Sequence, residues 1–259
     1  MYENIKIEII DKIAILKLDR ADKLNALNNK MIEEIVNALQ ELNADNNVRI
    51  IVISGEGKAF CAGGDLVEAS EMRKSASSYN WIQNAQKIQI TLEESPKIIL
   101  CSINGAALGG GMELALACDI RIASSNAVFA VPEINVGLLP CGGGMSKLSN
   151  LIGLGRAKEM VLTGRKVSAE EALSIGLVSE VVDHDKLKHR TMELAQELAN
   201  KPPLAVALAK ETMNMNIGAH YKVGLKNEAR AVGLLFGTED RLEGLKAFME
   251  RRKPDYKGE

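Results

Sequence analysis

Two nearly unbroken apolar runs, each closed by a glycine turn, constrain the fold of this chain most strongly. The first covers residues 48–54 and ends at Gly55, and the second covers residues 97–103 and ends at Asn104-Gly105. Strands that read as continuous apolar runs are buried on both faces, as in sheets covered by helices. The sequence therefore predicts an α/β core.

Further strands and helices are expected around these runs. Residues 5–10 and 13–18 read as the two strands of a hairpin. Residues 29–42 place their apolar side chains on one helical face. Residues 66–94 read as helical but polar and irregular, so we expect a mobile or variable element there.

The end of the chain is expected to be wholly helical. The expected helices cover residues 185–200, 204–215, 220–235 and 239–252. A length of 259 residues fits one large domain with an appendage. We therefore divide the chain into a core, residues 1–183, and a C-terminal helical region, residues 184–259. The apolar content of that region exceeds what a solvent-exposed bundle needs, so subunit contact is expected to cover it.

Composition narrows the function classes. The formal net charge is −2 and the basic residues form no dense run, so nothing indicates a nucleic-acid partner. The four cysteines make no C-x-x-C pair, which favours reduced, cytosolic thiols. The N-terminus is acidic where a signal peptide would be basic, and no apolar run reaches about 18 residues. We expect a cytoplasmic protein without membrane attachment.

Three common types of site do not fit the sequence. The turns at Gly109 and Gly153 lack the third glycine of a dinucleotide fingerprint, and Gly57-Lys58 lacks the flanking residues of a phosphate loop. A serine hydrolase is excluded because no G-x-S-x-G occurs and all three histidines lie in the helical tail. No His/Cys or carboxylate cluster has ligand spacing, so no metal is expected.

Three glycine-rich turns follow the apolar strands and precede expected helices. They cover residues 57–66, 104–113 and 137–144. Glycine lets the backbone adopt positive φ and lets a ligand approach the main chain closely. Such a turn either permits tight packing of a helix against a strand or forms a ligand site, and one turn alone does not decide between the two.

The second turn favours a ligand site at the start of a helix. A helix that begins at Gly110 or Gly111 aims unpaired N–H groups, and the positive end of its dipole, outward. If the N–H of Gly64 in the first turn faces that of Gly110, the two can hold the oxygen of a thioester carbonyl as it becomes an enolate. Gly64 and Gly110 are therefore our candidates for an oxyanion hole.

Two glutamates are candidates for acid–base chemistry beside this site. Glu113 lies three residues after Gly110, close to one helical turn. Glu133 lies in an otherwise apolar segment, where a buried carboxylate costs free energy unless it is paired or used. Each has a structural alternative. Glu113 can be a favourable charge in the first turn of a helix, worth roughly 0.3–1 kcal/mol, and Glu133 can be a cap or a solvated turn residue.

As a pair, the two carboxylates suit the addition of water to an acyl thioester. One, ionised, takes a proton from water as it attacks the β-carbon, and the other, protonated, delivers a proton to the α-carbon of the enolate. Their like charges couple their titrations, so the apparent pKa values belong to the pair. The residues alone thus favour an enzyme that hydrates, or dehydrates, a small acyl thioester.

The chain resembles the crotonase, or enoyl-CoA hydratase/isomerase, superfamily over essentially its full length. The matching stretches are residues 19–27, 58–66, 104–119, 132–144 and 155–178. The resemblance implies a core of repeated ββα turns and C-terminal helices used in trimerisation, often as a dimer of trimers. It also implies that the amides of Gly64 and Gly110 hold the thioester oxygen.

The same resemblance implies a binding surface for coenzyme A and a reaction. It places Ala62, Asp65 and Leu66 at the border of the coenzyme, and a segment that includes Lys23, Leu24 and Ala26 along it. Residues 68–89, with the single Trp81, are expected to shape the acyl pocket. Both glutamates of true hydratases are present, which favours hydration of a short or medium 2-enoyl-CoA to 3-hydroxyacyl-CoA. Water is the co-substrate, and no metal or redox cofactor is implied.

Two departures from the usual hydratase pattern flank Glu133. Hydratases commonly read Pro-Gly-x-Gly-Gly-Thr-Gln-Arg-Leu where residues 140–148 read Pro-Cys-Gly-Gly-Gly-Met-Ser-Lys-Leu, and Ala130-Val131 replaces a common Gly-Gln. These changes bear on the acyl chain accepted and on the reaction. The alternatives are a double-bond isomerase, a hydratase for branched or cyclic acyl-CoA, and a non-catalytic acyl-CoA-binding subunit.

Overall fold

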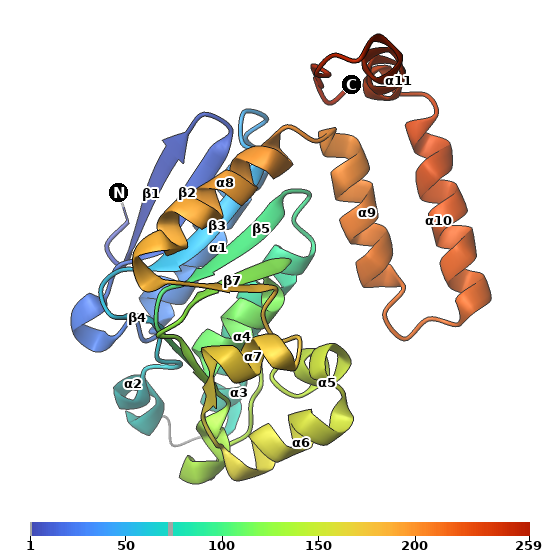
Figure 1. The fold of residues 1–259 in the computed structure, drawn as a ribbon. Helices are drawn as coiled ribbons and strands as arrows, with labels where there is room; N and C mark the ends of the chain where they lie inside the picture. Colours follow the sequence, from blue (N-terminus) through green and yellow to red (C-terminus); the bar gives the residue numbers. More distant parts are fainter. Residues whose placement is uncertain (1, 72–74) are drawn as a thin grey trace.

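A six-stranded sheet forms the centre of the protein. The computed structural model describes residues 2–71 and 75–259 (Figure 1). The strand order is β1-β2-β3-β5-β7-β10, antiparallel between β1 and β2 and parallel between the others. The strands are β1 (Ile5–Ile10), β2 (Ile13–Leu18), β3 (Ile50–Gly55), β5 (Ile98–Ile103), β7 (Ile120–Ser124) and β10 (Glu180–Val182). The predicted hairpin is confirmed, and the two apolar runs are the central strands β3 and β5.

Helices cover both faces of this sheet, which explains the unbroken apolar runs. Alternate side chains of β2, β3 and β5 pack against α8 (Leu187–Ala199), which lies across the sheet in Figure 1. The remaining side chains of the same strands join the main core with α1 (Asn29–Ala44) and α4 (Gly110–Ala117). Because side chains alternate between faces, a strand covered on both sides is apolar at every position.

A second, four-stranded sheet includes two short strands that fall within the predicted glycine turns 57–66 and 104–113. Its order is β4-β6-β8-β9, with strands β4 (Ala59–Cys61), β6 (Ala106–Leu108), β8 (Val128–Ala130) and β9 (Val167–Ser168). The sequence analysis read the segments around β4 and β6 as turns because each strand has only three residues. Gly55 and Gly105 allow the close crossing, since a β-carbon on either would collide with backbone of residues 58–60.

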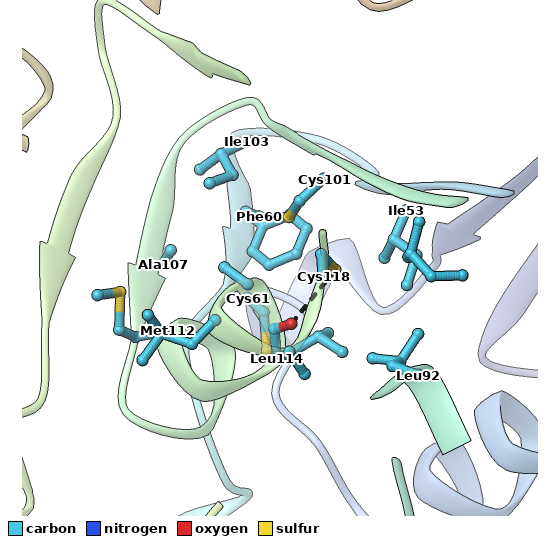
Figure 2. Close-up of a cluster of buried hydrophobic side chains, with 14 of the residues drawn as sticks. Ile53, Phe60, Cys61, Leu92, Cys101, Ile103, Ala107, Met112, Leu114 and Cys118 are labelled. Atoms are coloured by element: carbon cyan, nitrogen blue, oxygen red, sulfur yellow. Dashed lines mark hydrogen bonds between the residues drawn. The ribbon is translucent and has the colours of Figure 1, made fainter. Parts of the chain in front are cut away.

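The core beneath the glycine turns is apolar and closely packed. Figure 2 shows Phe60 of β4, Cys101 of β5 and Leu114 of α4 in one cluster. Cys118 lies in it too, and its Sγ donates to the carbonyl oxygen of Leu114 at 3.4 Å. Burial of this cluster fixes the start of α4 relative to both sheets.

The rest of the chain is mainly helical. The remaining helices that precede α8 are η1 (Ala21–Lys23), α2 (Leu66–Glu71), α3 (Ser75–Glu93), η2 (Pro132–Val136), α5 (Ser146–Ile152), α6 (Leu154–Thr163), α7 (Ala169–Ser174) and η3 (His184–Lys186). The predicted helical stretch 66–94 is thus two helices, and residues 72–74 between them lie outside the described residues. In the part of the chain described, no helix is long and apolar enough to cross a membrane.

The C-terminal helices extend away from the two sheets. They are α9 (Pro203–Met215), α10 (Tyr221–Leu235) and α11 (Glu239–Glu250), close to the predicted ranges (Figure 1). One buried ion pair, Lys210 Nζ to Asp119 Oδ2 at 2.9 Å, ties α9 to the core. The division of the chain near His184 stays a prediction, since α8, which follows it, packs on the main sheet.

Candidate active site

The site begins at the N-terminus of α4, where Gly109 and Gly110 change the course of the chain. Gly109 has φ 52° and ψ −124°, a conformation that favours glycine, and its N–H donates to Ala130 O at 2.9 Å. Gly110 is the first residue of the helix, so its N–H has no acceptor within α4. As predicted, the sequence opens a helix here with an available amide.

The loop before α2 brings Gly64 next to Gly110. A parallel bridge joins Leu27 to Gly64: Leu27 N donates to Gly63 O at 2.7 Å, and Asp65 N donates to Leu27 O at 2.9 Å. These two hydrogen bonds use the residues on either side of Gly64, so the N–H of Gly64 itself takes no part in the bridge. A β-carbon on Gly110 would stand 3.4 Å from Gly64 N. The first and second glycine turns therefore meet at these two residues.

Glu113 lies one turn into α4 and is almost fully buried. Its Oε1 accepts hydrogen bonds from the backbone N–H groups of Gly142, at 2.6 Å, and Gly144, at 2.9 Å. The pKa of Glu113 is raised to about 7, mainly by burial and also by the charge of Glu133, against the lowering effect of these amides. Glu113 is thus an acid–base group near neutrality, held by the third glycine turn.

Glu133 approaches the same helix start from the 3₁₀ helix η2. A β-carbon on Gly109 would stand 3.0 Å from Glu133 Oε1, so the absence of a side chain at Gly109 admits the carboxylate. Oε2 of Glu133 is buried and has no hydrogen-bond partner, and burial raises the pKa of Glu133. The apolar segment that precedes Glu133 forms strand β8 as far as Ala130, and Pro132 starts the helical turn that carries Glu133.

The predicted coenzyme-binding residues lie in the two segments that the bridge between Leu27 and Gly64 joins. Lys23 ends η1 with an exposed side chain, and Leu24 follows in the left-handed region at φ 52°. Asp65 Oδ2 pairs with the guanidinium of Arg20 at 3.1 Å, so this carboxylate holds the loop in place. The other predicted residues in these two segments are Ala26, Ala62 and Leu66.

Comparison with known proteins identifies the family of this chain. Residues 8–259 match the model of the family described as enoyl-CoA hydratase/isomerase. The chain belongs to the enoyl-CoA hydratase/isomerase family. The short-chain-enoyl-CoA hydratase of Clostridium acetobutylicum is 37% identical over 96% of this chain and 96% of its own length. The crotonyl-CoA hydratase of Syntrophomonas wolfei subsp. wolfei is 38% identical over 98% of both chains.

A solved member of the same family has nearly the same fold. The crystal structure of enoyl-CoA hydratase from Bacillus anthracis matches with a TM-score of 0.96 and 39% identity, over 99% of this chain and all of that one. The predicted crotonase-like α/β fold with a C-terminal helical region is therefore confirmed.

Helix α3 brings side chains to this family site that the sequence analysis did not assign. A β-carbon on Gly64 would stand 3.2 Å from the indole of Trp81, and Gln86 Nε2 donates to Cys141 O at 2.6 Å. The amide of Gln89 lies against Gly142. All three lie within residues 68–89, the stretch expected to shape the acyl pocket, in which the sequence singled out only Trp81.

Cys141 also lies near the two glutamates, and the sequence predicts no role for it. Burial raises the pKa of its thiol to about 11, and the charges of Glu113 and Glu133 add to the effect. The thiol is therefore neutral at physiological pH. The sequence marked this position only as a departure from the usual hydratase glycine.

Proposed function

We propose that this protein is an enoyl-CoA hydratase in which Glu113 takes a proton from water and Glu133 delivers a proton to the α-carbon. The observation that carries this role is the meeting of two carboxylates, both with raised pKa, at a helix N-terminus beside Gly64. The relatives named as hydratases support the reaction class. The assignment of individual residues rests on the physical argument that follows.

The amides of Gly64 and Gly110 are the proposed oxyanion hole. Both N–H groups lie at the junction of the first two glycine turns, and Gly110 has the dipole of α4 behind it. As water adds, the π electrons of the double bond move onto the thioester oxygen, which becomes an enolate oxygen. Donors fixed before the reaction stabilise that charge without reorganising, which lowers the barrier.

Glu113 is the proposed base because its hydrogen bonds favour the charged form. Both amide donors use Oε1, which leaves Oε2 as the oxygen for the water. Oε2 takes one proton as the water oxygen bonds to the β-carbon. A pKa of about 7 makes Glu113 a stronger base than an exposed glutamate while it is still substantially ionised at neutral pH.

Glu133 is the proposed acid. Its buried Oε2 has no donor to stabilise a negative charge, so the neutral carboxyl is favoured. It delivers its proton to the α-carbon as the enolate electrons return to form that C–H bond. The product is 3-hydroxyacyl-CoA, and passage of the proton from Glu113 to Glu133 restores the starting state.

The remaining features of the proposal concern binding and assembly. The coenzyme A portion is placed along Lys23, Leu24, Ala26, Ala62, Asp65 and Leu66. We expect water as the only co-substrate, with no metal or redox cofactor, in a cytoplasmic homotrimer or dimer of trimers without nucleic-acid or membrane partners. Among the described residues, no group of three His, Cys, Asp or Glu side chains could hold a metal ion.

Loss of the conjugated enoyl thioester absorbance with crotonyl-CoA and longer 2-enoyl-CoA substrates tests the proposal. We expect turnover, and mass analysis should show a product heavier by one water. An unchanged mass with a moved double bond would instead identify an isomerase. Binding of acyl-CoA without turnover at high enzyme concentration would identify a non-catalytic subunit.

A further inference from the structure

Within the described part of the chain, three buried polar atoms that lack a hydrogen-bond partner converge on the candidate site. They are Trp81 Nε1, Gln89 Oε1 and Glu133 Oε2. Their side chains lie against Gly64, Gly142 and Gly109, one in each region where the glycine turns meet. Buried polar atoms are nearly always paired in folded proteins, so their clustering indicates a site whose partners arrive with substrate or water.

Two of these side chains come from α3, which spans the site. Trp81 packs over Gly64, and Gln89, about two helical turns further on, reaches the third glycine turn. The hydrogen bond from Gln86 Nε2 to Cys141 O fixes the helix to that turn. On the same face, Ile88 and Leu92 are buried in the main core. Gln89 therefore occupies a position set by packing on both sides.

The carboxamide of Gln89 lies beside the oxygen that the proposed base leaves open. A β-carbon on Gly142 would stand 2.8 Å from Gln89 Nε2 and 3.0 Å from Glu113 Oε2. The two groups thus flank one small space that the bare Gly142 keeps clear. An apolar side chain at residue 89 would fill that volume without offering a hydrogen bond.

We propose that Gln89 positions the attacking water together with Glu113, which rests on the proposed hydratase function. A water molecule that donates one hydrogen to Glu113 Oε2 still has a second hydrogen and a lone pair that does not attack the β-carbon. The carboxamide of Gln89 can accept a hydrogen bond from that second hydrogen or donate one to that lone pair. Fixing the water on two sides restricts it to the line of attack on the β-carbon. After addition, the same carboxamide holds the new 3-hydroxyl group.

The test compares Gln89→Met with the wild-type enzyme in crotonyl-CoA hydration. Methionine keeps the length of the side chain and removes both hydrogen-bonding groups. We expect kcat to fall about tenfold or more, as for loss of a hydrogen bond to a charged centre, with KM within about twofold. The acid limb of the kcat profile should move to higher pH because Glu113 loses a neighbouring donor.

Gln89→Glu gives an independent check that does not depend on packing. It keeps the shape of glutamine but places a like charge beside Glu113, so the acid limb should move further up in pH than in the methionine variant. Gln83→Met is the matched control, since Gln83 lies exposed on the same helix, where its Nε2 donates to Tyr79 Oη. It should behave as wild type.

Three results would overturn the role of Gln89: a kcat of Gln89→Met within about twofold of wild type, a KM that rises in step with the fall in kcat, or an unmoved acid limb in both variants. Each requires a wild-type enzyme that hydrates. Absence of hydration in the wild type would instead reject the proposed function itself.

Discussion

At the scale of single residues, the hydrogen-bond donors around them distinguish Glu113 from Glu133, although the two side chains are chemically identical. Glu113 accepts two backbone amides on Oε1, whereas Glu133 leaves one oxygen buried without a donor. Burial raises the pKa of both, and the charge of Glu133 adds to the rise at Glu113. The pair is therefore expected to share one proton near neutral pH.

This sharing predicts a bell-shaped pH dependence of kcat. The base must be ionised, so the rate should fall as pH drops below about 7, the pKa of Glu113. The acid must be protonated, so the rate should also fall at alkaline pH as the pair loses its proton. Initial rates with saturating crotonyl-CoA from pH 5 to 10 measure both limbs. A rate that stays flat from pH 5 to 8 would contradict the assignment of the base.

Sequence could identify some of these residues and not others. Glu113 and the two glycines were predictable because a glycine at a helix start fixes where the next turn's side chain lies. Gln89 and Cys141 were not, because their roles depend on packing between α3 and the third glycine turn, which are more than fifty residues apart along the chain. No local pattern records such a contact.

At the scale of elements, the positions of η2 and α4 depend on each other through Gly109. This residue needs a positive φ to start α4, and its bare α-carbon leaves room for Glu133. Contacts between distant segments also decide which strands could be predicted from the sequence. Patterns of apolar residues located β3 and β5. Strands β4 and β6 are too short for a periodic pattern, and they form because neighbouring backbone segments supply their hydrogen bonds.

Gly109→Ala should therefore reduce catalysis and stability together. The left-handed backbone costs roughly 1–2 kcal/mol for alanine, and the added methyl group would push Glu133 out of place, with an expected loss of about 10²-fold in kcat. Crotonyl-CoA kinetics and thermal unfolding measure the two effects. The control is Gly155→Ala in α6, where a β-carbon meets nothing within 4 Å. Equal kinetics for the two variants would reject the positional role of Gly109.

At the scale of the whole molecule, the C-terminal helices leave many apolar side chains exposed. Phe248 and Met249 of α11 are 83% and 76% exposed, and Leu234 and Phe236 near the end of α10 are 67% and 62% exposed. Apolar side chains gathered on one appendage indicate a surface that is covered in an assembly. The sequence predicted this surplus from composition, although it could not say which side chains are uncovered.

The purified protein should therefore self-associate. We expect light scattering coupled to size-exclusion chromatography to give the mass of a trimer or hexamer of the 28.0 kDa chain. Phe248→Asp should shift the population towards smaller species because it places a charge in an apolar interface. Lys253→Asp, a charge change close by in the exposed tail, is a suitable control. A monomer at all concentrations would contradict the assembly proposal.

The folded protein also carries a cost for ionising Glu113. The pKa rises from 4.5 in the unfolded chain to about 7 when folded, so this group destabilises the fold progressively as pH increases from about 4.5 to 7. Glu113→Gln removes the ionisation and can still accept the two amide hydrogen bonds. Its free energy of unfolding relative to wild type should rise over that range by up to about 3 kcal/mol. Denaturant unfolding at pH 4.5, 6 and 8 measures this difference, and a constant difference would show that Glu113 has an ordinary pKa.

We propose that Glu113 and Glu133 carry out the two proton transfers of one hydration reaction. The most direct test of these roles is the crotonyl-CoA hydration rate of wild type, Glu113→Gln, Glu133→Gln and the double variant. We predict that each single change lowers kcat by at least about 10²-fold, and that the double variant loses far less than the product of the two, because both groups serve one reaction. Single variants that retain near wild-type rates would contradict the account.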